Sequence, residues 1–384
     1  CRASPLPNPR FLLMGSSSST KVSPDQKEGP KGAQPGSFAL PEIRDEVGTT
    51  PPMAVWPPEY LKRRVEIAKN ERVLELKSGR HMSYFTEGKN APGSVALLCL
   101  HGFGMNKFMW VQKKPMDGIF LICPDRIGYG GSSTQPKTGF SFADGVKDYV
   151  QLLDSLRVER FYVAGHSMGG SWALSLAAAL GDRVLGCLSI SSPCCVRHPE
   201  VDLKQMMKSV DTGMKAIITI NEGCCACCKR CMVDAIGSML YHPDKTRDFG
   251  FASFYKDGMK GQDKGTAFAH SKMDNDHFFV AKILDSVLHG CVDEYQMTVD
   301  FTRVFAAEWS YNLTMIKCKT FIYNGFDEVV PLSFAQKLHE LIPGSEFVAM
   351  KEDGHSTILL KFDSMVKGML NGVAIKDTDV HTEQ

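Results

Sequence analysis

Two hydrophobic periods alternate along this chain from about residue 70 onward. Short continuous apolar runs bounded by turn residues are typical of buried strands, and apolar residues recurring every three to four positions are typical of helices. The first pattern predicts strands at 72–76, 81–85, 94–100, 118–123, 161–164, 184–190, 319–323 and 346–350. The second pattern predicts helices at 142–156, 170–180, 332–341 and from about 357 to 370.

The alternation of strands and helices determines the expected fold class. A helix that follows a strand returns the chain to the same sheet, so repeated strand–helix units build parallel strands with helices on both faces. The sequence therefore predicts an α/β fold with a mainly parallel central sheet. The alternation of predicted strands and helices stops between 190 and 319. We therefore expect one core formed by 66–193 and 312–384, interrupted by an insertion at 194–311.

The N-terminal segment has a different composition. Eleven of the 20 prolines fall within the first 58 residues, together with a run of four serines. Such a segment cannot bury enough apolar surface to fold by itself. We expect residues 1–65 to form a flexible Pro/Ser-rich tail.

Two targeting patterns occur within this tail. Met14-Gly15 followed by serines would form an N-myristoylation signal if Met14 were the true start. Residues 1–24 contain Arg2, Arg10 and Lys21 and no acidic residue, a weak feature of organellar transit peptides.

The overall charge argues against nucleic acid as a partner. The chain has 44 Lys and Arg against 43 Asp and Glu, a formal charge of +1 and a pI of about 7.6. Nucleic-acid binding would need a local basic patch that the sequence does not contain. No apolar run reaches the roughly 18 residues that span a bilayer. The 13 cysteines are odd in number and follow no signal peptide, which predicts free thiols and a cytoplasmic location, with an organelle or a membrane surface as alternatives.

The strongest chemical motif is Gly165-His166-Ser167-Met168-Gly169, a G-x-S-x-G between a predicted strand and a predicted helix. A serine forced into so tight a turn projects its hydroxyl above the carboxyl edge of the sheet, and glycine is needed where a Cβ would clash. The next helix directs its N-terminal amides at the same place. Ser167 is therefore the predicted nucleophile.

A serine nucleophile needs a base that is itself oriented by an acid. Asp327 and His355 each follow a predicted strand, so that both can lie at the carboxyl edge of the sheet. The chain order Ser, Asp, His is that of the G-x-S-x-G elbow fold. We predict His355 as base and Asp327 as orienting acid, with Glu328 and Asp353 as competitors for the acid.

An oxyanion hole would complete the site. The loop after the strand at 94–100 can present a backbone amide opposite the amide that follows the nucleophile. We assign the donors to the N–H groups of Phe103 and Met168, which would stabilise charge that develops in the tetrahedral intermediate. His101 is predicted to be structural, and His166 to pack beside the elbow.

These motifs together resemble the α/β-hydrolase superfamily, over about residues 72 to 370. The strand followed by His-Gly, the Asp125–Ser132 turn, the elbow, and the loops at 325–331 and 353–355 occur in the family's order. The 80–85 segment and the Asp125–Ser132 turn look most like plant and algal members. The resemblance implies an α/β-hydrolase fold and ester or acyl hydrolysis by Ser167, Asp327 and His355. The serine argues against dehalogenases and epoxide hydrolases, which use aspartate there.

In this superfamily an insertion at this place forms a mostly helical lid over the active site. By resemblance, residues 194–311 are the expected lid. The insertion is rich in methionines, flexible side chains that can line an adaptable apolar pocket or fill a core. These methionines are Met206, Met207, Met214, Met232, Met239, Met259 and Met273.

The insertion also contains a cysteine cluster for which three interpretations stay open. Its members are Cys224, Cys225, Cys227, Cys228 and Cys231. C-x-x-C spacings could bind zinc if Cys194-Cys195 supplied a second pair. Palmitoylation beside Lys229-Arg230 would bring the lid to a membrane surface. The third interpretation is unmodified, oxidation-prone thiols.

The sequence thus predicts a serine hydrolase that needs no cofactor or metal and cleaves a carboxylic ester of a small molecule or an acyl lipid. Peripheral membrane contact through the cysteines or N-terminal acylation is an additional expectation. Acyl transfer or C–C hydrolysis by the same triad is the first alternative. A hydrolase-fold ligand-binding receptor with little turnover is the second.

Overall fold

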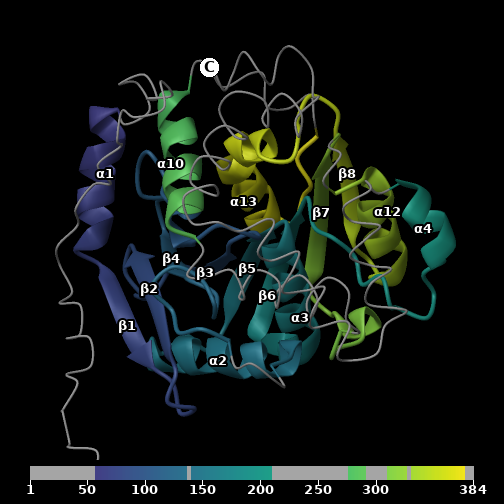
Figure 1. Ribbon diagram of the computed structural model, residues 1–384, viewed down its shortest axis with the longest axis horizontal. Helices are drawn as coiled ribbons and strands as arrows, with labels where there is room; N and C mark the ends of the chain where they lie inside the picture. The colour runs from purple at the N-terminus through teal and green to yellow at the C-terminus, as the bar shows by residue number, and fades with distance from the viewer. Residues whose placement is uncertain (1–56, 136–139, 210–275, 291–308, 327–329, 377–384) are drawn as a thin grey trace, which may run out of the picture. The chain divides into compact units, whose positions relative to one another are not determined.

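The computed structural model describes residues 57–135, 140–209, 276–290, 309–326 and 330–376. Within them an eight-stranded sheet has the order β1-β2-β4-β3-β5-β6-β7-β8 (Figure 1). β1 and β2, and β2 and β4, pair antiparallel, and all the other pairs are parallel. The strands are β1 (Glu71–Glu75), β2 (His81–Glu87), β3 (Val95–Leu100), β4 (Ile119–Pro124), β5 (Phe161–His166), β6 (Val184–Ile190), β7 (Lys319–Gly325) and β8 (Glu346–Met350). The predicted mainly parallel α/β fold is confirmed.

Helices cover both faces of this sheet. Those of the described chain are α1 (Pro58–Ala68), α2 (Phe142–Ser155), α3 (Met168–Leu180), α4 (Leu203–Ser209), α10 (His277–Leu288), α12 (Leu332–Leu341) and α13 (Phe362–Leu370), with short 3-10 turns η2 (Lys107–Trp110), η3 (Gly181–Arg183), η6 (Leu313–Met315) and η7 (Thr357–Lys361). Successive side chains of a strand point to opposite faces. In β3, Leu98 and Leu100 accordingly join the apolar cluster of α2, α3 and α12, whereas Leu97 and Cys99 join that of α1, α10 and α13.

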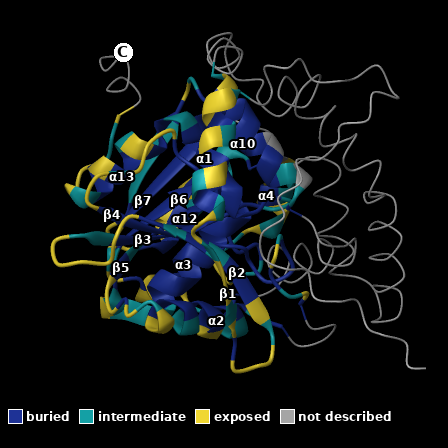
Figure 2. Cartoon of the chain, turned by 90° about the vertical axis from the view of Figure 1, so that its left-hand side faces the viewer, coloured by how far each residue is buried: buried dark blue, intermediate teal, exposed yellow. Residues whose placement is uncertain are grey.

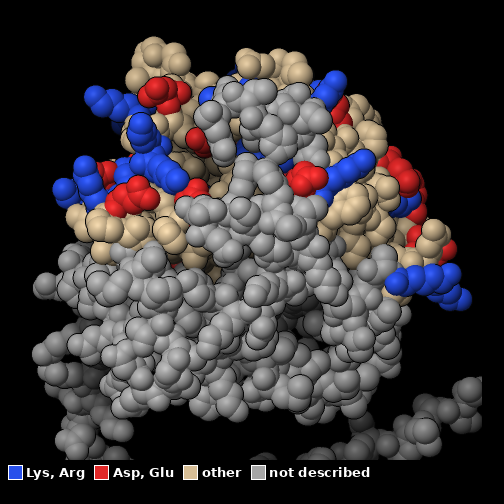
Figure 3. Space-filling model, turned by 90° about the horizontal axis from the view of Figure 1, so that it is seen from above, with Lys and Arg blue, Asp and Glu red and all other residues tan. Residues whose placement is uncertain are grey.

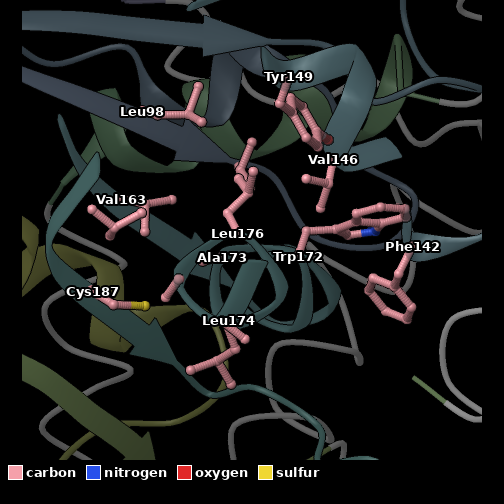
Figure 4. Packing of buried hydrophobic residues seen from close by; sticks show 14 of the residues in the cluster. Leu98, Phe142, Val146, Tyr149, Val163, Trp172, Ala173, Leu174, Leu176 and Cys187 are labelled. Atoms are coloured by element: carbon pink, nitrogen blue, oxygen red, sulfur yellow. The ribbon is translucent and has the colours of Figure 1, made fainter. Parts of the chain in front are cut away.

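The first cluster is centred on α3, which is buried along nearly its whole length. Trp172 of α3 packs against Phe142 of α2 with their ring centroids 4.4 Å apart (Figure 4). A Cβ at Gly145 would lie 2.2 Å from the Trp172 ring. The close approach of α2 to α3 therefore explains a glycine inside a helix, where it otherwise costs about 1 kcal/mol.

The second cluster brings together two helices that are far apart in the sequence, α1 and α10 (Figures 1 and 2). Tyr60 packs edge-on against Phe278, with ring centroids 5.3 Å apart. The Tyr60 hydroxyl also donates to the buried carboxylate of Asp285, and Arg64 Nε donates to the same oxygen at 3.1 Å. Pairing and hydrogen bonds reduce the large cost of burying a carboxylate.

Two expectations about domain boundaries need correction. Helix α1 begins at Pro58, inside the segment expected to be tail, and it buries Tyr60 and Ile67 in the core. Helix α10 lies inside the insertion at 194–311 that we expected to form a lid, yet its buried side chains belong to the second apolar cluster of the core. Residues 1–56, 210–275 and 291–308 lie outside the described residues, so the rest of the tail and the lid stay predictions.

The predicted elements otherwise match closely, with one further difference. The helix expected from residue 357 is a 3-10 turn up to Lys361 before α13 begins at Phe362. No helix in the described part of the chain is long and apolar enough to cross a bilayer. Basic and acidic side chains are interspersed over the described part of the face in Figure 3, in keeping with the balanced charge of the sequence.

Candidate active site

Ser167 occupies a strained turn between β5 and α3. Its φ of 54° and ψ of −128° are sparsely populated by residues with a Cβ. Its N–H donates to the carbonyl of Ile190 at the end of β6, at 2.8 Å, which fixes the turn at the carboxyl edge of the sheet. Ser167 is 7% exposed. This strained strand-to-helix turn is the local geometry that the sequence motif predicts.

The glycines around Ser167 are required by close backbone approaches. A Cβ at Gly165 would lie 2.2 Å from the carbonyl oxygen of Gly169, and a Cβ at Gly169 would lie 2.1 Å from that of Leu100. A Cβ at Gly170 would lie 1.6 Å from Ser192 Oγ. The backbone around this turn is therefore packed so closely that no side chain fits at these three glycine positions.

The two predicted oxyanion donors lie on segments that flank Ser167. Met168 is the first residue of α3, where backbone N–H groups have no partner inside the helix. Phe103 lies in the loop after β3, and the Cβ position of its neighbour Gly102 is only 3.2 Å from Ser167 Cβ. The structure thus brings the loop of Phe103 against the nucleophile, and the two amides remain the predicted donors.

His101 fixes this loop from below, as the sequence suggested. Its Nδ1 donates to the carbonyl of Gly102 at 2.9 Å, and its Nε2 accepts the backbone N–H of Arg126 at 2.8 Å. Burial, and then the charge of Arg126, hold the pKa of His101 well below its usual value. A neutral His101 therefore ties the loop after β3 to the loop after β4.

A buried ion pair holds the same two loops together. Lys107 Nζ lies 2.6 Å from Asp125 Oδ2 and donates to Ser83 Oγ at 2.9 Å. Asp125 also accepts the backbone N–H groups of Lys107 and Gly131, both at 2.9 Å. The buried carboxylate of Asp125 thus accepts hydrogen bonds from three donors, which offset the cost of burying its charge.

His355 is 6% exposed and lies in the loop after β8. His166 Nε2 donates to the main-chain carbonyl of His355 at 2.8 Å, and the two imidazole rings have centroids 4.7 Å apart. Since His166 precedes Ser167 directly, the predicted base is brought beside the predicted nucleophile.

Asp327, the predicted acid, lies outside the described residues, but the residues on either side of it are described. The N–H of Phe326 donates to the carbonyl of Asp353 at 2.7 Å. Asn324 Nδ2 donates to the carbonyls of Gly325 and Val330, at 2.8 and 3.1 Å. The first end of the loop of Asp327 is therefore bonded to the loop of His355, and Asn324 ties the two ends of the Asp327 loop together.

Glu328 and Asp353 are the two competitors of Asp327 for the role of the acid. Glu328 lies outside the described residues. Asp353 is buried, and its Oδ2 lies 2.6 Å from Nζ of Lys361, which is buried as well. The carboxylate of Asp353 is thus engaged by a lysine, which weakens it as a partner for His355.

One contact that the sequence reasoning missed involves Gly290, just after α10. A Cβ at Gly290 would lie 2.3 Å from the carbonyl oxygen of Gly104 in the loop of Phe103. Its own carbonyl accepts the N–H of Gly130 at 2.7 Å. Nothing in the local sequence indicates this contact, because the three glycines come from distant segments.

The cysteine cluster at Cys224–Cys231 lies outside the described residues. Cys194 and Cys195, considered as its partner pair for zinc, are both buried. Burial, followed by the neighbouring Cys195, raises the pKa of Cys194 well above its usual value, and its Sγ contacts Met206 Sδ at 3.6 Å. Within the described ranges no three His, Cys, Asp or Glu side chains gather as a metal site would require.

Comparison with known proteins agrees with this geometry. Residues 95–216 match the family model for the alpha/beta hydrolase fold. The chain also superposes on the crystal structure of a hydrolase from Pseudomonas aeruginosa with a TM-score of 0.55, covering 78% of this chain and 98% of that one at 18% identity. This protein has the α/β hydrolase fold.

Curated relatives match only part of the chain. A fluoroacetate dehalogenase from a Burkholderia species is 35% identical over 114 residues, which are 28% of this chain and 38% of the relative. Lipase 3 of a Moraxella species is 38% identical over 109 residues, which are 27% of this chain and 33% of the relative. The chain thus matches only about a third of the length of each of these two relatives.

Proposed function

We propose that this protein is a serine hydrolase that cleaves a carboxylic ester of a small molecule or an acyl lipid. Ser167 attacks the acyl carbon, His355 accepts the proton and returns it to the leaving alcohol, and Asp327 orients the imidazole. Water then releases the acid from the acyl-enzyme. The amides of Phe103 and Met168 stabilise the oxyanion.

The observation that carries this proposal is the position of Ser167. A buried serine with φ of 54° lies between a strand and a helix, beside the loop of His355. Strain at such a position persists where the surroundings enforce it, and it exposes a nucleophile to substrate at the sheet edge. Ser191 also has a positive φ, of 44°, so the support comes from the place of Ser167 between β5 and α3, beside the loop of His355.

The similarity to a dehalogenase does not carry its reaction over to this chain. The match covers 28% of the chain, and fold does not determine chemistry. Dehalogenases of this superfamily use an aspartate nucleophile, whereas this elbow contains Ser167. The partial similarity to a lipase is compatible with the serine, so ester hydrolysis is the better supported reaction.

Hydrolysis of p-nitrophenyl esters of graded acyl length, by the purified chain and by Ser167→Ala, tests the proposal. Ser167→Ala should lower turnover by about 10⁴-fold or more, because removal of a triad nucleophile leaves only residual catalysis. Ser175→Ala is the matched control. It lies on the same helix and donates only to the Ser171 carbonyl, at 2.9 Å, so it should keep wild-type kcat.

Two results would contradict the proposal. Turnover that survives Ser167→Ala would exclude the serine mechanism. A folded wild-type protein that hydrolyses no ester and is not labelled by a fluorophosphonate would favour the receptor alternative. Addition of a competing alcohol separates hydrolysis from acyl transfer, because a transferase forms the new ester faster than the free acid.

A further inference from the structure

We propose that His166 is a positioning residue, which holds the base His355 against the nucleophile by a hydrogen bond from its side chain to the main chain. This inference rests on the roles proposed above for Ser167 and His355. His166 is the last residue of β5 and directly precedes Ser167. Its backbone therefore belongs to the elbow, while its side chain reaches the loop of the base.

The hydrogen bond joins segments 189 residues apart in sequence. His166 Nε2 donates to the carbonyl oxygen of His355 at 2.8 Å, and the two rings are inclined by 51° with centroids 4.7 Å apart. His166 is fully buried and His355 is 6% exposed. A bond shielded from water in this way restricts movement of the His355 main chain relative to Ser167.

The protonation state of His166 suits this role. Because a carbonyl oxygen can only accept, Nε2 must carry the proton. Burial, and then the charge of His355, lower the pKa of His166 to about 3. The ring is therefore neutral at ordinary pH. It can hold the base without a second positive charge beside the imidazolium that forms on His355 during catalysis.

The opposite edge of the ring faces the oxyanion loop. A Cβ at Gly102 would lie 3.4 Å from His166 Nδ1 and 3.2 Å from Ser167 Cβ. One side chain thus lies among the three segments that carry the nucleophile, the base and a proposed oxyanion amide. A residue that only filled this space would not need a hydrogen-bond donor at Nε2. The experiment therefore tests the hydrogen bond that Nε2 donates to His355.

Two substitutions separate the hydrogen bond from the imidazole. His166→Gln can place an amide N–H near the position of Nε2, whereas His166→Leu fills similar space without a donor. Kinetics are expressed per serine labelled by a fluorophosphonate, so that misfolded protein is not counted. We expect kcat of His166→Leu to fall by about 10- to 100-fold with KM nearly unchanged, as for a misplaced catalytic group. The glutamine variant should recover most of this loss.

The pH dependence of kcat/KM distinguishes a positioning role of His166 from a merely structural one, because loss of a structural residue would not shift it. The acidic limb of kcat/KM reports protonation of the free enzyme's base. It should shift in His166→Leu, where the geometry around His355 is lost, and stay near wild type in His166→Gln. Wild-type kcat per labelled serine in His166→Leu would overturn the proposal, as would an equal loss in both variants.

A measurement on the wild-type protein covers the case in which the leucine variant does not fold. Nitrogen-15 NMR should show His166 as the neutral Nε2–H tautomer throughout about pH 5 to 8. Titration of His166 within that range would overturn the proposal. Failure of the proposed function would look different, because Ser167 of the wild-type protein would then remain unlabelled or Ser167→Ala would remain active.

Discussion

Phe326 and Asp353 are joined by a main-chain hydrogen bond of 2.7 Å that links the loop after β7 to the loop after β8. A Cβ on the preceding Gly325 would lie 2.6 Å from the carbonyl oxygens of both Asp353 and Gly354. The two loops therefore pack backbone to backbone, and only glycine fits between them. This contact brings the segments of the proposed acid and the proposed base together without using either side chain.

Asn324→Leu should impair catalysis through the loop of Asp327. The substitution removes the amide that donates to the carbonyls of Gly325 and Val330 on either side of that loop. We expect kcat to fall by about 10- to 100-fold, because a small displacement of a catalytic group has an effect of this size. The measurement is ester turnover per fluorophosphonate-labelled serine.

Thr320→Val is the control for this prediction. Thr320 lies on the same strand, is buried, and donates only locally to the carbonyl of Cys318 at 3.2 Å. It should lose stability while keeping wild-type kcat. If Asn324→Leu also kept wild-type kcat, the side chain of Asn324 would have no part in positioning Asp327.

The elbow and the base loop could be predicted from sequence because their signals are local. Gly165 and Gly169 flank Ser167 at fixed spacing between an apolar strand and a helix, and His355 lies in a short loop after a strand. The strands themselves could be recognised because their buried runs are continuous. The relative position of the loops could not be predicted, because it depends on bonds such as that from His166 to His355, 189 residues apart.

Helix α1 shows the opposite case. Its sequence is rich in charged residues, which is typical of a solvent-exposed segment, and it follows a proline-rich tail. Two of its arginines are buried all the same, because Arg63 pairs with Glu87 and Arg64 pairs with Asp285. Partners so far along the chain leave no periodic signal in the helix itself.

Gly290→Ala should disturb the oxyanion loop from a distance. Its Cβ would lie 2.3 Å from the carbonyl oxygen of Gly104 and 2.8 Å from that of Ser286, so backbone must move. Because Gly104 is next to Phe103, we expect about a tenfold loss of kcat together with a lower melting temperature. Steady-state kinetics and thermal unfolding measure the two effects.

Gly79→Ala separates this clash from a general cost of replacing glycine. Gly79 has φ of 77° but open space around its Cβ position, in the turn between β1 and β2. It should cost about 1 kcal/mol through backbone strain and leave kcat unchanged. Equal kinetic effects of both substitutions would contradict a specific contact between Gly290 and the oxyanion loop.

Lys361→Met should destabilise the fold by about 3–5 kcal/mol, the usual cost of leaving a buried charge without its partner. Lys361 and Asp353 are both buried and lie 2.6 Å apart. Replacing both, as Lys361→Met with Asp353→Asn, should recover part of this loss. Urea unfolding at neutral pH measures the free energy of each variant.

Lys337→Met is the exposed counterpart. Its ion pair with Glu340 is 2.9 Å long, but the Glu340 side chain is 64% exposed. Its removal should change the free energy of unfolding by about 0.5 kcal/mol or less. A loss from Lys361→Met no larger than this would show that Asp353 does not depend on Lys361, and would make Asp353 a stronger candidate for the acid.

Because His101 and His166 are buried, we expect the free energy of unfolding to decrease in acid. The pKa of His166 is lowered to about 3 and that of His101 lies well below its usual value, in both cases first of all by burial. Below about pH 6.5, the pKa of a histidine in the unfolded chain, these two histidines bind protons in the unfolded state but stay neutral in the folded state. The free energy of unfolding should therefore decrease as the pH falls from about 6.5 toward the folded values, by about 1.4 kcal/mol per pH unit for each histidine.

Comparison of slopes isolates the contribution of His166 from that of the carboxylates, which titrate over part of the same range. His166→Gln cannot take up a proton in either state, so its unfolding free energy should depend on pH less steeply than that of wild type. The difference should be about 1.4 kcal/mol per pH unit between about pH 4 and pH 6, measured by urea unfolding at several pH values. Parallel curves would mean that His166 titrates alike in the folded and unfolded states, contrary to a buried neutral ring that donates to His355.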